Sequence, residues 1–168
     1  MSTEFLITAL IICLLPGSGV LYTLAVGLGR GFKASIAAAF GCTLGIIPSA
    51  LASIVGLAAI FHASALAFQT LKYLGVAYLL YMAWSILRSG GAMGLDADRS
   101  PASMAKIATS GALINVLNPK LSLFFLAFLP QFVPLDTPHA TATLLLHAAV
   151  FMAITFVTFV GYGACAAF

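Results

Sequence analysis

The chain alternates between long apolar stretches and short polar links. Five apolar stretches stand out, at roughly 5–28, 34–61, 66–87, 107–133 and 140–168. Each one exceeds the roughly 20 residues that an α-helix needs to cross about 30 Å of hydrocarbon. The alternation of polar and apolar residues that marks a membrane barrel is absent. Helices are therefore the structure in which the backbone N–H and C=O groups can form their hydrogen bonds within lipid. The pattern predicts an all-α, polytopic transmembrane bundle of five helices in a single membrane domain, 1–168.

Composition supports the membrane as the solvent of this chain. Hydrophobic residues make up 62% of it and charged residues only 7%, whereas soluble domains are about 25% charged. The net charge of the chain is +3, and its seven Lys and Arg residues are spread thinly between apolar runs. A nucleic-acid binder would instead gather them on one face. The three cysteines show no metal-type spacing. The sequence therefore predicts membrane lipid as a partner, and no nucleic acid, metal or cofactor.

The basic residues indicate the orientation of the helices. The first and third links contain Arg30, Lys33, Arg88, Arg99 and Lys106. The second and fourth links contain neither Lys nor Arg. Because Lys and Arg are enriched in cytoplasmic loops, we expect the N-terminus outside and 88–106 to be a cytoplasmic loop.

Small residues form a stripe along the second predicted span. They recur at every fourth position, as Ala37, Gly41, Gly45, Ser49 and Ser53. Such a stripe lets two helix backbones approach closely within lipid. Small residues are also common in membrane helices in general, so the stripe alone leaves both interpretations open.

Two spans are interrupted near their centres. The first contains Pro16-Gly17-Ser18 and the fourth contains Asn118-Pro119-Lys120, each about a dozen residues into its span. A proline inside a helix removes one backbone hydrogen bond and blocks another carbonyl. Interrupted helices at matching positions of two inverted halves point to a transporter's substrate site, where helix N-termini attract a carboxylate and exposed carbonyls a cation. A zwitterion such as an amino acid fits both, although a simple proline kink remains the alternative for the first break.

Charged and titratable residues inside the spans are few. Lys120 lies near the middle of the fourth span, where a lysine costs about 2.5–3.5 kcal/mol on insertion scales. Either it serves the substrate or it ties helix ends to backbone carbonyls. Lys72 and His147 each have a functional and a structural interpretation. All four acidic residues lie in the links or at the N-terminus, so proton coupling would have to use these bases or the substrate's own charge.

Around these residues the chain resembles the LysE/RhtB family of amino-acid exporters, also called the lysine exporter or threonine and homoserine efflux family. The resemblance is strongest over 71–81 and over 115–132, which contains Asn-Pro-Lys and a later Pro-Gln-Phe. It implies export of amino acids or related small metabolites from a bacterial cytoplasm across the inner membrane, driven by the proton-motive force. It also implies a six-helix unit and a homodimer. Since the chain ends within its fifth apolar run, we expect an inverted three-helix repeat with the last helix missing.

This chain departs from the family pattern at two places, and rival functions stay open. Ser18 replaces the second proline of the family's Pro-Gly-Pro, and an apolar segment follows Gly45, so the family's substrate cannot be transferred. We predict substrate binding by Pro16, Gly17, Ser18, Lys72, Asn118, Pro119 and Lys120. A membrane enzyme is not expected, because no nucleophile-and-base arrangement is found in the spans. A truncated, non-transporting scaffold or partner subunit is the alternative.

Overall fold

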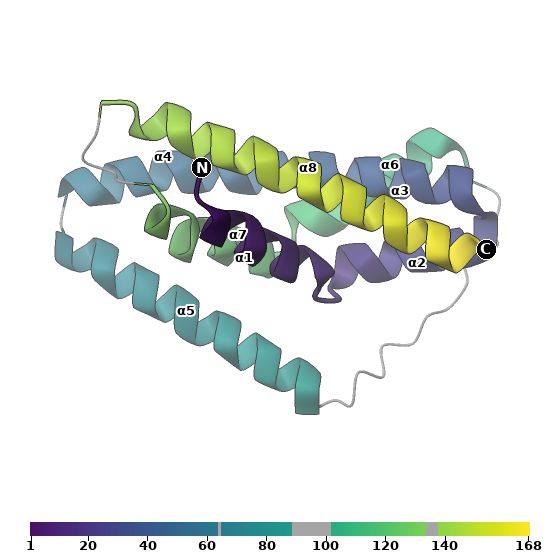
Figure 1. The fold of residues 1–168 in the computed structure, drawn as a ribbon, viewed down its shortest axis with the longest axis horizontal. Coiled ribbons are helices and arrows are strands. Elements are labelled where there is room, and N and C mark those ends of the chain that lie inside the picture. Colours follow the sequence, from purple (N-terminus) through teal and green to yellow (C-terminus); the bar gives the residue numbers. More distant parts are fainter. Residues whose placement is uncertain (64, 89–101, 134–137) are drawn as a thin grey trace. The chain divides into compact units, whose positions relative to one another are not determined.

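The computed structural model of the protein describes residues 1–63, 65–88, 102–133 and 138–168. Within these ranges the ordered segments are helices in the chain order α1 Thr3–Leu14, α2 Ser18–Arg30, α3 Phe32–Leu44, α4 Ile46–Ala63, α5 Ala65–Arg88, α6 Met104–Val116, α7 Pro119–Ala127, the short 3-10 helix η1 Leu129–Gln131, and α8 Ala140–Ala167 (Figure 1). No β-strand occurs in these ranges, which confirms the all-α class. Most of the predicted loop 88–106 falls outside the described residues.

Two helical stretches are each long and apolar enough to cross a membrane. Phe32–Leu57 has 26 residues and joins α3 to most of α4, and Ala140–Ala167 has 28. Two bent pairs reach that length together: Thr3–Leu14 with Ser18–Arg30, bent by 54°, and Met104–Val116 with Pro119–Gln131, bent by 53°. The described residues therefore offer up to four spans, as a multi-pass membrane protein requires. The third predicted span, 66–87, coincides with the 24-residue α5, and its crossing stays a prediction.

Both predicted breaks are present, at the residues where the sequence placed them. Helix α1 ends at Leu14 and α2 begins at Ser18, while α6 ends at Val116 and α7 begins at Pro119. Along the chain, a bent pair followed by a long continuous helix thus occurs twice. This order is the one that two three-helix halves require, and their inversion stays a prediction.

The chain forms two compact units, which are described separately. As far as the structure describes them, unit 1 comprises Met1–Ser2, Pro48–Ala92 and Pro119–Ala149, and unit 2 comprises Thr3–Ile47, Met93–Asn118 and Val150–Phe168. Helices α4 and α8 contribute residues to both units. The single domain predicted for 1–168 stays a prediction.

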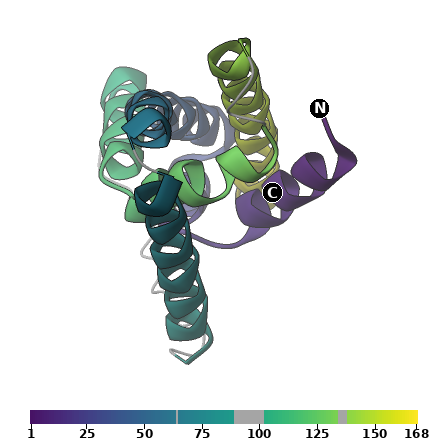
Figure 2. The ribbon, with the colours of Figure 1, turned by 90° about the vertical axis from the view of Figure 1, so that its left-hand side faces the viewer.

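In unit 2, helix α3 packs closely against α6, and the two lie side by side in Figure 2. The small residues of the predicted stripe make this approach. A Cβ atom added at Gly41 would overlap the backbone of Ala108, and one added at Gly45 would overlap the carbonyl of Ala112. The interpretation of the stripe as a helix-packing surface is therefore confirmed here.

In unit 1, the same stripe continues on α4 with two serines. The Ser122 hydroxyl on α7 donates to Ser49 Oγ at 3.3 Å, and the Ser53 hydroxyl lies 3.4 Å from the Ser122 carbonyl. On the other side, α7 packs against α5, where a Cβ at Gly75 would lie 2.7 Å from Ala127 Cβ. Hydroxyl contacts and small residues thus hold α7 between its neighbours in this unit.

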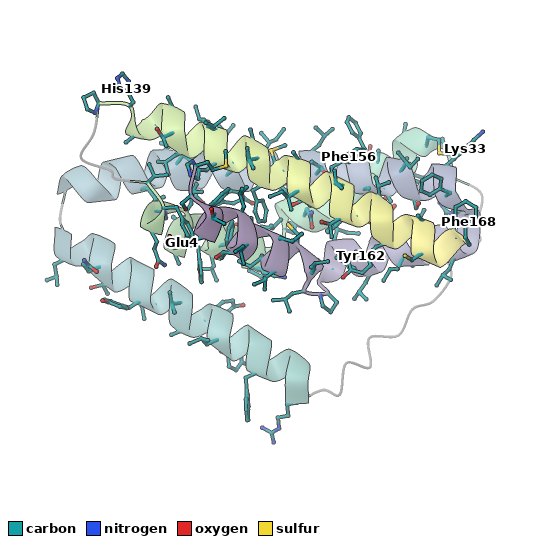
Figure 3. All side chains as sticks on the ribbon, viewed as in Figure 1. Glu4, Lys33, His139, Phe156, Tyr162 and Phe168 are labelled. Atoms are coloured by element: carbon teal, nitrogen blue, oxygen red, sulfur yellow. The ribbon has the colours of Figure 1, made fainter. Side chains whose placement is uncertain are left out.

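Basic residues gather at one end of unit 2. Arg30 ends α2, Lys33 lies in the first turn of α3, and Lys106 lies in the first turn of α6. The Phe32 and Phe168 rings are 5.8 Å apart, and Figure 3 shows Lys33 and Phe168 at this same end. One core cluster joins the three helices nearby and consists of Val26, Ala34, Ala38 and Ile107. Three of the five basic residues that the sequence assigns to the cytoplasmic side, Arg30, Lys33 and Lys106, therefore lie at the same end of unit 2.

Candidate functional site

The first break replaces regular helical hydrogen bonds with local ones. The Leu15 amide donates to the Ile11 carbonyl at 3.0 Å, and Pro16 has no amide hydrogen to continue the series. Gly17 is extended, with φ −134° and ψ −179°, and caps α2 at its N-terminus. The break therefore leaves a helix start, with its first amide groups lacking intrahelical acceptors, in the middle of the predicted span.

A tyrosine from α8 satisfies one carbonyl group released at this break. The Tyr162 hydroxyl donates to the Leu14 carbonyl oxygen at 2.8 Å. Tyr162 is labelled in Figure 3, on the C-terminal part of α8. In hydrocarbon a carbonyl without a donor is costly, so this contact makes the end of α1 tolerable within a membrane.

At the second break, too, the backbone hydrogen bonds join residues that are close together in the sequence. The Leu117 amide donates to the Leu113 carbonyl and the Asn118 amide to the Asn115 carbonyl, each at 3.2 Å. Pro119 then begins α7, at the position where a missing amide hydrogen costs a helix least. Asn118 is thus the residue at which α6 has ended and α7 has not yet begun.

The two breaks meet in unit 2 through their polar side chains. Asn118 Nδ2 donates to Ser18 Oγ at 3.3 Å, across a sequence separation of 100 residues. Ser18 is exposed and Asn118 is half-buried. The structure thus brings together one residue from each predicted triplet, while the role of these residues in substrate binding stays a prediction.

A buried polar cluster lies directly beside this contact. Asn115, on α6, is 2% exposed, and its Nδ2 donates to the Cys42 carbonyl at 2.8 Å. The Thr23 hydroxyl donates to the Gly19 carbonyl at 2.9 Å, and the Cys42 thiol lies 3.9 Å from the same oxygen. Sequence reasoning did not select Asn115. The available signal was its position three residues before Asn118, in the same predicted span.

This arrangement offers neutral hydrogen-bonding groups and a helix terminus. The groups are the Ser18 hydroxyl, the Asn118 carboxamide and the first-turn amides of α2. A helix N-terminus carries about half a positive charge and favours carboxylates, while carboxamide and carbonyl oxygens accept from ammonium groups. Such a set suits a small molecule that bears both charges.

The remaining predicted residues belong to unit 1. Lys120 lies in the first turn of α7 and is half-buried, and Pro119 is exposed. Lys72 lies on α5, and its side chain is outside the described part of the chain. Their participation in one site with Ser18 and Asn118 stays a prediction.

The other titratable residues of the spans make structural contacts. His147 is 3% exposed and its Nδ1 lies 2.8 Å from the Thr143 carbonyl oxygen. Cys13 Sγ lies 3.2 Å from Thr155 Oγ1. No group of three or more His, Cys, Asp or Glu residues gathers in the described ranges. These contacts match the packing alternative for His147 and leave a proton-carrying role untested.

Comparison with known proteins gives one family and several relatives. The family model described as LysE type translocator matches residues 10–168. The homoserine/homoserine lactone efflux protein of Salmonella typhimurium is 29% identical over 96% of this chain and 78% of its own length. An uncharacterized membrane protein of Vibrio cholerae is 31% identical over 97% and 79%, and the leucine efflux protein of Salmonella choleraesuis is 28% identical over 90% and 72%. No solved structure matches this chain.

Proposed function

Because the chain belongs to the LysE type translocator family, we propose that it exports amino acids or related small metabolites from the bacterial cytoplasm across the inner membrane. Two kinds of relative support this substrate class, since one is named for homoserine and homoserine lactone efflux and another for leucine efflux. The proposal makes the protein a carrier and not an enzyme.

One observation carries the proposal to particular residues: the hydrogen bond between Asn118 and Ser18. It joins the interruptions of two separate spans. Irregular backbone at membrane depth is tolerated where it is buried in protein or lines a cavity, and carriers use such breaks to hold substrate. In our proposal the segment from Pro16 to Ser18, at the N-terminus of α2, receives the substrate carboxylate, and Asn118 contacts the substrate's other polar groups.

Lys120, Pro119 and Lys72 complete the proposed binding residues. A lysine in the first turn of a helix within a span adds a full positive charge to the partial charge of the helix N-terminus. Lys120 meets this description on α7. We propose that Lys120 contacts the carboxylate or takes part in energy coupling, and that Lys72 has a secondary role.

Orientation and driving force complete the proposal. The N-terminus lies outside, in keeping with the basic residues Arg30, Lys33 and Lys106 at one end of unit 2. Export is driven by the proton-motive force, with charge carried by Lys120, Lys72, His147 or the substrate itself. The protein acts within membrane lipid, as a homodimer in line with the family resemblance.

The direct test is amino-acid export from living cells. Cells with and without the protein are loaded with amino acids by dipeptide feeding, and extracellular accumulation is followed with and without an uncoupler. We expect faster accumulation of at least one amino acid with the protein, and loss of that difference with the uncoupler. Equal accumulation of every amino acid, with the protein present in the membrane, would refute export.

The variant Asn118→Ala tests the site itself. Loss of one hydrogen bond is worth about 1 kcal/mol, so we expect KM for export to rise about fivefold. Thr109→Ala is the matched control, because Thr109 is an exposed polar residue of the preceding helix α6 whose hydroxyl bonds within its own turn, at the Ala105 carbonyl. A scaffold without transport predicts instead that Asn118→Ala and Lys120→Ala leave extracellular amino acids unchanged.

A further inference from the structure

Asn115 fills a space left open by two glycines, Gly19 on α2 and Gly45 between α3 and α4. A Cβ atom built on Gly19 of α2 would lie 2.9 Å from Asn115 Oδ1 and 3.3 Å from its Nδ2. A Cβ atom built on Gly45, just after α3, would lie 2.9 Å from Asn115 Cβ. The carbon–carbon distance at Gly45 is shorter than the usual separation of about 3.5–4.0 Å between nonbonded carbon atoms, and the 2.9 Å distance at Gly19 is likewise too short for a real Cβ atom. The side chain of Asn115 therefore fills space that exists only because residues 19 and 45 have no side chain.

The carboxamide also makes a directed bond inside this space. Its Nδ2 donates to the Cys42 carbonyl at 2.8 Å. Cys42 lies in the last turn of α3. Asn115 is 2% exposed. If its carboxamide is removed by mutation, water therefore does not take over the hydrogen bond to the Cys42 carbonyl. This bond fixes the end of α6 to the end of α3, beside the start of α2.

Asn115 is connected to the proposed site by its backbone as well. The Asn118 amide donates to the Asn115 carbonyl at 3.2 Å. Asn115 lies in the last turn of α6 against Gly19, and Asn118, just after the end of α6, contacts the adjacent Ser18. Any rotation or shift of α6 at Asn115 is therefore transmitted directly to the contact between Asn118 and Ser18.

We propose that Asn115 is a positioning residue that sets the register of α6 against α2 and α3, so that Asn118 reaches Ser18 in the substrate-binding state. This proposal rests on the proposed export function and deepens it. Because Asn115 is 2% exposed and its Nδ2 is bonded to the Cys42 carbonyl, it acts in this proposal through Asn118. Its removal should therefore weaken substrate binding and leave the turnover of each transporter molecule largely unchanged.

The first test measures the geometry without any transport. In a protein whose native cysteines are replaced by alanine, the pair Ser18→Cys and Asn118→Cys is oxidised in membranes, and the fraction of disulfide is measured. We expect efficient cross-linking with Asn115 present and a yield about fivefold lower with Asn115→Leu, which keeps a similar volume without a donor. Thr109→Leu, on the exposed face of the same helix, should leave the yield unchanged.

The second test measures export kinetics in the native sequence, normalised to the amount of protein in the membrane. Asn115→Leu and Asn115→Ala should each raise KM about fivefold or more, since neither side chain has a donor for the Cys42 carbonyl. The maximal rate per molecule should change less than about twofold. In an Asn118→Ala background the same substitutions should add little, because the residue through which they act is gone.

The outcomes of these tests distinguish the positioning role of Asn115 from the proposed export function. Unchanged cross-linking with Asn115→Leu would overturn the positioning role, whatever the transport result. A fall in maximal rate with constant KM, or the absence of both Asn115 variants from the membrane, would show a folding role instead. If the unaltered protein exports nothing, the export function fails, and the cross-linking yield still decides whether Asn115 positions Asn118.

Discussion

Replacing Gly41 by alanine tests the packing that holds unit 2 together. A Cβ atom at this position would lie 2.6 Å from both the carbonyl carbon and the Cα of Ala108, and closer still to the carbonyl oxygen. Nonbonded carbon atoms normally stay about 3.5–4.0 Å apart. The obstacle is backbone, which has no rotamer to change, so α3 and α6 must separate locally by roughly 1 Å.

The magnitude follows from two opposing terms. Overpacking a well-packed interface costs about 1–3 kcal/mol, and a backbone obstacle places Gly41→Ala at the upper end of that range. Alanine recovers up to about 1 kcal/mol through its higher helix propensity. We therefore expect Gly41→Ala to lower the free energy of unfolding by about 2 kcal/mol, as the difference of these two terms.

Gly56 provides the matched control within the same continuous span, Phe32–Leu57. A Cβ atom there would meet no atom within 4 Å, so only the propensity term applies and Gly56→Ala should be neutral or stabilising by up to about 1 kcal/mol. Both variants are purified in mild detergent and unfolded by titration with SDS. Equal unfolding midpoints for the two variants would refute the close approach of α3 and α6.

Two further predictions concern α8. Tyr162→Phe removes the donor to the Leu14 carbonyl and should lower the free energy of unfolding by about 1–2 kcal/mol in the same SDS titration; an unchanged midpoint would show that this carbonyl finds another donor. Cys165 is exposed whereas Cys13 and Cys42 are buried, so with the N-terminus outside and five spans a membrane-impermeant maleimide should label the protein in inside-out vesicles and not in intact spheroplasts. Labelling in spheroplasts would reverse the orientation.

Local chemistry explains which features the sequence could predict. Long apolar runs determine helices in lipid because the backbone has no other partner there. Pro16 and Pro119 determine where helices are interrupted, because the loss of an amide hydrogen acts on the nearest turn. Hence the all-α class and both breaks followed from residue types and spacing alone, whereas the packing role of Gly41 and Gly45 was one of two interpretations that the sequence left open.

Long-range register explains what was missed. The bond between Asn118 and Ser18 joins residues 100 positions apart, and that between Asn115 and Cys42 joins residues 73 positions apart. The spacing of Asn115 from Asn118 is a local signal, but it does not tell an enclosed asparagine from a lipid-facing or solvent-facing one. Only the placement of α6 against α2 and α3 shows that its carboxamide is enclosed. The substrate roles proposed for Lys120 depend on such long-range geometry too and stay predictions.

The packing stripe and the proposed site are parts of one contact. Gly45 lets α3 approach the Ala112 carbonyl, and the same missing side chain makes room for Asn115 Cβ. The approach of α3 therefore determines whether Asn115 reaches the Cys42 carbonyl, and Asn115 in turn determines where Asn118 stands. A change that separates α3 from α6 should weaken substrate binding as well as stability, although it lies far along the chain from Ser18. Small residues that the sequence marks only as helix packing thus shape the site through the position of α6.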